Sequence, residues 1–186
     1  MLDFAGGTDM TWRAPRRPVV PGTDPSGHTV LVRISFGTAH AGDHSRNISH
    51  EAAGAIRALS QAGARVVVIG GLGDPGGDIN QAFSLKPYAS ALEEATGCPV
   101  RFIGESVGSG AEAGVATLED GDIALLENIR FHTDERRHAW VFAVRLSVLG
   151  DCFIDLGNPP SNPDGWQAAL GAILPPPSAT KSRETH

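Results

Sequence analysis

Three polar residues that follow the apolar segment 28–36 have side chains suited to acid–base chemistry: His40, Asp43 and His44. An unperturbed histidine titrates near neutral pH, so His40 or His44 could serve as a general base. Two histidines and an aspartate could also ligate a metal ion, but their spacing matches no metal-binding motif. The simpler interpretation is a loop with solvated histidines, and we expect no metal and no other cofactor.

A second polar group contains Glu127, Arg130 and His132. A guanidinium binds carboxylates and phosphates through paired hydrogen bonds, so Arg130 and Arg46 are the best candidates for holding an anionic substrate. Glu127 could transfer protons. The alternative is structural: Glu127 would pair with Arg33 or another internal base and hold the end of a strand.

Further candidates stand directly after apolar segments or at their ends: Ser35, Asp74 and Asp155. Asp74 lies in the segment GLGDPG at 71–76, which matches the dinucleotide pattern G-x-G-x-x-G. The Pro-Gly-Gly that follows Asp74 disfavours the helix that this pattern requires. The Asp74 carboxylate would also face the negatively charged pyrophosphate. We therefore expect no dinucleotide site. Cys152 lies inside an apolar segment and is expected to be a small buried hydrophobe.

Composition argues against several classes of partner. The 186 residues include 15 Lys and Arg against 21 Asp and Glu, a formal net charge of −6. An acidic chain lacks the positive field that nonspecific nucleic-acid binding needs, and no apolar run approaches the ~18 residues of a membrane span. Two cysteines make no disulfide framework, and no apolar signal-peptide core is present. We expect a cytoplasmic domain that binds neither nucleic acid nor membrane.

Apolar strand-like segments alternate with helix-like segments along the chain. Strands are predicted at 28–36, 65–69, 100–103, 123–126 and 152–154. Helices are predicted at 47–62, 84–96, 110–118, 134–149 and 164–173, with Ser49 or Asn47 capping the first and Ser84 the second. The alternation predicts one three-layer α/β domain at 28–174 with a parallel sheet of five or six strands, a flexible leader at 1–27 and a disordered tail at 175–186. Ligands of such sheets bind beyond the carboxyl ends of the strands, where the candidate residues lie.

A series of motifs in a fixed order resembles the N-terminal half of phosphoglycerate kinase. The motifs are VLVRISF, SRN, RVVVIGGLGDPGG, FSLKPYASALEEATGCPVRFIGESVG and GDIALLENIRFH, and LLENIRFH at 125–132 is the most specific. The resemblance covers about 29–156 and implies the fold of that family's N-terminal lobe. In the family this lobe binds 3-phosphoglycerate through a basic patch, and a C-terminal lobe binds ATP or ADP with magnesium. The 186 residues end where the helix linking the lobes would begin, so we expect the nucleotide lobe to be absent.

Several residues depart from the family's substrate-binding pattern. The Asp and Asn of R-x-D-F-N-x-P are Ser35 and Gly37 here, and the His and Arg of H-L-G-R-P are Gly71 and Asp74. The motif D-A-F-G-T-A-H-R is replaced by LGNPP at 156–160. Two arginines, Arg46 and Arg130, match the family's motifs. A carboxylate beside a phosphate costs binding energy, so the resemblance implies the fold without the family's activity.

The segment AWVFAVRLSVL at 139–149 is apolar on all sides of the predicted helix, with Arg145 as its one charge. In the resembling family the outer positions, Val141 and Val144 here, are charged. We expect this helix to form a homodimer interface. The alternative is that the leader, including Trp12, folds over it.

Two functions follow from these observations. The first is a nucleotide-independent enzyme of specialised small-molecule biosynthesis, an isomerase, cyclase or lyase acting on a carboxylate- or carbonyl-bearing substrate by acid–base chemistry. Its catalytic residues would be Asp74, Asp155, Glu127, His40 and His44, and its substrate-binding residues Arg46, Arg130, Ser35 and His132. The second is a noncatalytic small-molecule-binding or regulatory module that keeps the fold.

Overall fold

A computed structural model describes residues 24–36, 48–132, 138–158 and 165–177. Three of the predicted site residues, His40, His44 and Arg46, lie outside these ranges. So do most of the predicted leader and tail. The predicted helix at 134–149 begins in the gap at 133–137.

Five parallel strands form one sheet. They are β1 (Thr29–Arg33), β2 (Arg65–Ile69), β3 (Val100–Ile103), β4 (Ile123–Leu126) and β5 (Cys152–Asp155). Their order across the sheet is β3-β4-β2-β1-β5, and every neighbouring pair is parallel. The predicted α/β class with a parallel sheet is confirmed, with five strands in the described residues. β1 is shorter than the predicted 28–36. The apolar pattern continues past the strand because Ile34 and Phe36 are also buried.

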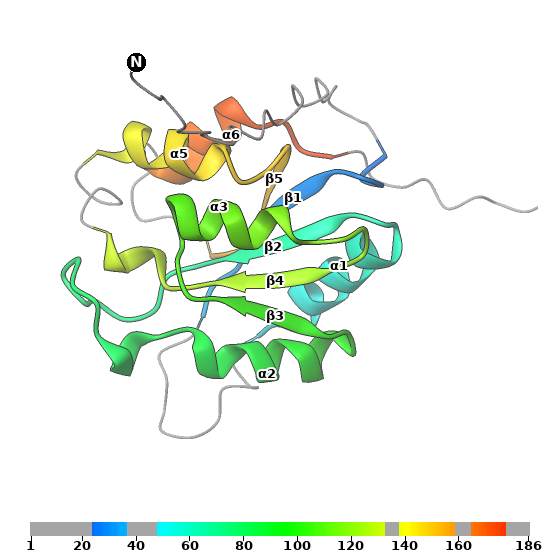
Figure 1. Ribbon diagram of the computed structural model, residues 1–186, viewed down its shortest axis with the longest axis horizontal. Coiled ribbons are helices and arrows are strands. Elements are labelled where there is room, and N and C mark those ends of the chain that lie inside the picture. Colours follow the sequence, from blue (N-terminus) through cyan, green and yellow to red (C-terminus); the bar gives the residue numbers. More distant parts are fainter. Residues whose placement is uncertain (1–23, 37–47, 133–137, 159–164, 178–186) are drawn as a thin grey trace, which may run out of the picture.

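Helices cover both faces of the sheet (Figure 1). The helices are α1 (His50–Gln61), α2 (Lys86–Thr96), α3 (Ser109–Ala116), α5 (Ala139–Ser147) and α6 (Trp166–Ile173), with short 3-10 turns η2 (Gln81–Phe83) and η3 (Ile129–Phe131). α1 and α2 pack on one face, and α3, α5 and α6 pack on the other. β2 shows the consequence: Val66 and Val68 contribute to the first core, while Val67 and Ile69 contribute to the second. A strand covered on both faces reads as a continuous apolar run, as RVVVI does.

Local signals set the helix ends, with one correction. Ser49 caps α1, since its hydroxyl accepts a hydrogen bond from the Ala52 N–H at 3.1 Å. α2 begins at Lys86 rather than directly after Ser84, with Leu85 in the cap position. The Ser84 hydroxyl still accepts from the Lys86 N–H at 3.2 Å. No helix within the described residues is long and apolar enough to cross a membrane.

Candidate functional site

The carboxyl ends of the strands meet at one edge of the sheet, as parallel pairing requires. Arg33, at the end of β1, is in register with Ile69 of β2 and Asp155 of β5. Asp155 is the last residue of β5. The segments that follow β1, β2 and β4 bring four more candidates to this edge: Ser35, Asp74, Glu127 and Arg130. We call it the carboxyl edge.

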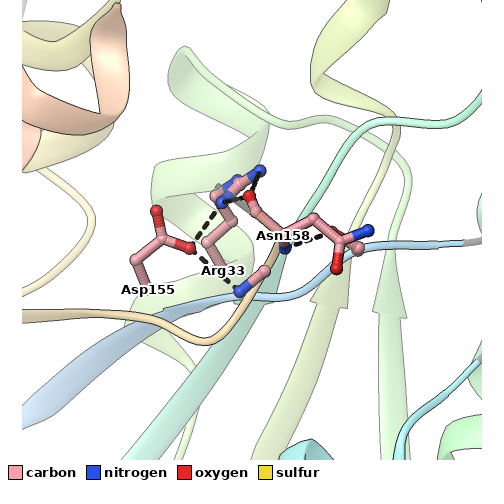
Figure 2. Close-up of polar contacts among 5 residues, drawn as sticks. Arg33, Asp155 and Asn158 are labelled. Carbon is pink, nitrogen blue, oxygen red and sulfur yellow. Dashed lines mark hydrogen bonds and ion pairs between the residues drawn. The ribbon is translucent and has the colours of Figure 1, made fainter. Parts of the chain in front are cut away.

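Arg33 joins the ends of β1 and β5 (Figure 2). Its Nη1 lies 2.5 Å from Asp155 Oδ1, and its Nη1 and Nη2 donate to the Asn158 carbonyl at 3.2 and 3.1 Å. The Asn158 N–H in turn donates to the Ser35 hydroxyl at 2.8 Å. Arg33 is 12% exposed and Asp155 29%, so water screens this ion pair only in part. Ser35 and Asp155 therefore belong to one network that ties the chain after β5 to β1.

Glu127 holds the start of α2. Its carboxylate accepts hydrogen bonds at 2.7 Å from both the Ser84 hydroxyl and the Leu85 N–H, and at 2.8 Å from the Asn128 N–H. The structural alternative for Glu127 expected Arg33 or another internal base as its partner, but these partners are a hydroxyl and two backbone N–H groups. β2 lies between β4 and β1, so the end of β4 does not adjoin Arg33.

Asn128 is a central residue of the edge that the sequence did not single out. It is fully buried, and its Nδ2 donates to the carbonyls of Leu72 at 2.8 Å and Phe83 at 2.9 Å. Its Oδ1 accepts from the N–H groups of Leu72 at 3.1 Å and Arg130 at 3.0 Å. The one signal in the sequence was an amide two residues after an apolar run, and a buried amide needs several partners.

Arg130 lies against the turn after β2. Its Nη1 donates to the Gly73 carbonyl. A Cβ at Gly71 would stand 2.7 Å from Arg130 Nε and 3.0 Å from Cδ, so the guanidinium stem occupies space that a side chain at 71 would need. The residue expected to hold an anion is thus bound to the protein's own backbone.

Two predicted residues remain, Asp74 and His132. Asp74 is exposed in the segment after β2. His132 is half-buried, and its ring centroid lies 6.1 Å from that of Phe142 in α5. The described site residues carry two guanidinium groups and three carboxylates. The guanidinium groups belong to Arg33 and Arg130, and the carboxylates to Asp74, Glu127 and Asp155.

Cys152 is unsuited to nucleophilic chemistry. It is buried in β5, and burial together with the neighbouring Asp151 charge raises the pKa of its thiol to about 11. The thiol is therefore protonated at neutral pH, as expected for a small buried hydrophobe. Within the ranges described, no three His, Cys, Asp or Glu side chains are grouped so that they could hold a metal.

Comparison with known proteins decides the family. The family model for phosphoglycerate kinase matches residues 21–156. The chain belongs to the phosphoglycerate kinase family. The phosphoglycerate kinase of Chlorobaculum tepidum is 37% identical over 134 residues, which are 69% of this chain and 33% of that protein. The enzyme of Salinispora tropica is 45% identical over 104 residues, covering 54% of this chain and 26% of the relative.

Solved structures agree on the fold. Phosphoglycerate kinase from Pyrococcus horikoshii superposes with a TM-score of 0.67 at 21% identity, covering 83% of this chain and 40% of that one. The Coxiella burnetii enzyme gives 0.68 at 21% identity, with 83% and 39% covered. The chain thus spans about a third of the length of the curated relatives it matches. The resemblance carried by LLENIRFH and the other motifs is confirmed for family and fold.

Proposed function

We propose that this phosphoglycerate kinase family domain is a noncatalytic regulatory module whose carboxyl edge does not take phosphoglycerate. One observation carries the proposal: among the described residues, Glu127, Arg130 and Asp155 already bind the protein itself. Arg33 is paired with Asp155, and Arg130 donates to the Gly73 carbonyl. Glu127 accepts three hydrogen bonds from the start of α2 and from Asn128.

Electrostatics supports the same conclusion. Phosphoryl transfer depends on positive groups and metal ions that neutralise phosphate oxygens. Here the Arg33 guanidinium is already neutralised by the Asp155 carboxylate, and the residue exposed in the segment after β2 is an aspartate, Asp74. The Arg130 guanidinium already donates one of its N–H groups to the Gly73 carbonyl, so a phosphate that took up this N–H would cost a hydrogen bond inside the protein.

Calorimetric titration of the full chain with 3-phosphoglycerate, and separately with magnesium–ATP, tests the proposal. We expect no saturable heat for either ligand at micromolar concentrations. The matched variants are Arg130→Ala, at the edge, and Arg57→Ala, an exposed arginine on α1. Micromolar binding of 3-phosphoglycerate that Arg130→Ala removes and Arg57→Ala leaves intact would overturn the proposal.

An acid–base enzyme is the second candidate, and one observation favours it. The Asp155 carboxylate is 29% exposed beside the Arg33 guanidinium, so a small carboxylate or carbonyl compound could approach both groups. Such an enzyme, an isomerase, cyclase or lyase, would use Asp155 to move a proton. Proton exchange of pyruvate methyl groups in D2O, followed by NMR, gives a first probe: exchange accelerated by the natural chain and lost in Asp155→Asn would favour the enzyme over the regulatory module.

A further inference from the structure

Exposed apolar side chains gather on α5. Among the described residues, the large apolar side chains with the most exposure are Ile79 at 80%, Trp140 at 60%, Val141 at 51%, Val144 at 43% and Val148 at 41%. All but Ile79 belong to α5 or to the residue that caps it. Spacings of three and four residues place these side chains on one face of the helix. The opposite face, with Phe142, Ala143 and Leu146, is buried in the core.

α6 continues this surface without charge. It packs against α5 in the same layer (Figure 1). Its sequence, WQAALGAI, has no charged residue, and its exposed positions are Ala168, Gly171 and Ala172. The one charged residue of α5 is Arg145, which is half-buried. We call the exposed residues of these two helices the α5/α6 surface.

We propose that the α5/α6 surface is the interface of a homodimer. A chain with a net charge of −6 needs a contact surface without like charges if two copies are to associate, and this surface meets that condition. A charged partner would find no opposite charge among the exposed residues of the α5/α6 surface. A second copy presents the same apolar side chains, so each buried group meets another of its kind.

A twofold arrangement can pair the stripe on α5 with itself. Two copies of α5 that run antiparallel about a twofold axis at Val144 place Val144 against Val144 of the partner subunit. Trp140 then lies over Val148 of the partner subunit, a large side chain on a smaller one. A buried tryptophan near the centre of an interface is a common source of affinity.

The size of the interface requires both helices. A stable interface buries about 800 Å² on each partner. The nine residues of α5 span about 14 Å, which is too short alone, so the small exposed residues of α6 must extend the contact. The leader is a poorer occupant, because residues 1–23 carry five charged residues that this surface cannot pair: Asp3, Asp9, Arg13, Arg16 and Arg17.

Sedimentation equilibrium of the full chain between about 1 and 100 µM tests the proposal. We expect a mass near twice the 19.4 kDa of one chain. Val144→Asp should weaken association about 100-fold or more, since two carboxylates would face each other across the axis. Ile79→Asp is the matched control, because it adds the same charge at an exposed aliphatic residue outside the surface, and it should leave the dimer intact. Circular dichroism checks that both variants fold.

Cross-linking tests the predicted twofold axis. In a Cys98→Ser background, Val144→Cys should form a disulfide-linked dimer under mild oxidation, whereas Ala58→Cys, at an exposed position of α1, should not. Three results would overturn the proposal: a monomer at every concentration, equal association of Val144→Asp and Ile79→Asp, or a monomer that dimerises only after Trp12→Ala, which would show that the leader covers the surface.

Discussion

Two glycines at the carboxyl edge each lie under an arginine side chain. A Cβ at Gly157 would stand 2.6 Å from Arg33 Nη1, and one at Gly71 would stand 2.7 Å from Arg130 Nε. The absence of a side chain at these positions lets both guanidinium groups lie on backbone carbonyls. Gly71 thus makes room for Arg130 to bind the turn.

Substitution Gly71→Ala tests this packing. The added methyl group must push Arg130 away and break its hydrogen bond to the Gly73 carbonyl, so we expect a loss of about 1–3 kcal/mol in the free energy of unfolding. Urea denaturation gives the value. In an Arg130→Ala background the same substitution should cost little, and equal costs in the two backgrounds would show that Arg130 does not occupy this space.

Asn128 should be the most sensitive polar residue of the edge. Asn128→Ala leaves the buried N–H and carbonyl of Leu72 and the carbonyl of Phe83 without a partner, so we expect a loss of about 2–4 kcal/mol in the free energy of unfolding. Asn80→Ala is a suitable comparison, since that amide caps the exposed η2 turn. A cost for Asn128→Ala no larger than for Asn80→Ala would contradict the assigned network.

The raised pKa of the Cys152 thiol leads us to expect a loss of stability at high pH. Its pKa is about 11 in the folded chain, above the value of about 8.5 for an unfolded cysteine. Between these values the unfolded state releases the proton and the folded state keeps it, so stability falls as pH rises. Urea denaturation of Cys152→Ala from pH 8 to 11 should show a smaller fall than the natural chain. Cys98→Ala should fall as the natural chain does.

At the scale of elements, the sequence predicted three of the strands best. β2, β3 and β4 have the predicted bounds, because each is a short segment of mostly apolar residues between turn segments. The start of α2 was predicted less well. Glu127, far along the chain, supplies the acceptor for the Leu85 N–H, and a local reading of the residues around Ser84 cannot include that contact.

α1 offers a stabilising substitution. Gly54 lies inside this helix, and a Cβ built there meets no atom within 4 Å. Gly54→Ala should therefore raise the free energy of unfolding by about 0.5–1 kcal/mol, through helix propensity and the entropy of the unfolded chain. Thermal and urea unfolding both measure it. A loss of stability would mean that α1 packs more tightly at Gly54 than the structure shows.

For the molecule as a whole, the sequence indicated that the candidate residues lie at the carboxyl edge, but not which of their side chains pair with one another. The alternation of strands and helices predicted a parallel sheet, and its carboxyl edge gathers most of the candidates described. The strand order β3-β4-β2-β1-β5 decides which end groups are neighbours, and no periodicity in the sequence carries that order. For this reason the Arg33–Asp155 pair was missed and an Arg33–Glu127 pair was considered instead.

The same architecture separates two parts of the molecule. The carboxyl edge is held together by its own side chains, whereas the α5/α6 surface exposes large apolar side chains. This distribution of groups supports the proposed regulatory module, which needs a surface for association more than an open catalytic site.

The most direct test is a crystal structure of the full chain grown with saturating 3-phosphoglycerate. We predict that Arg33 stays on Asp155, that Arg130 stays on the Gly73 carbonyl, and that no ligand lies at the carboxyl edge. Ligand density at the edge with the Arg130 guanidinium turned away from Gly73 toward the phosphate would contradict the closed edge and restore a substrate-binding role for this domain.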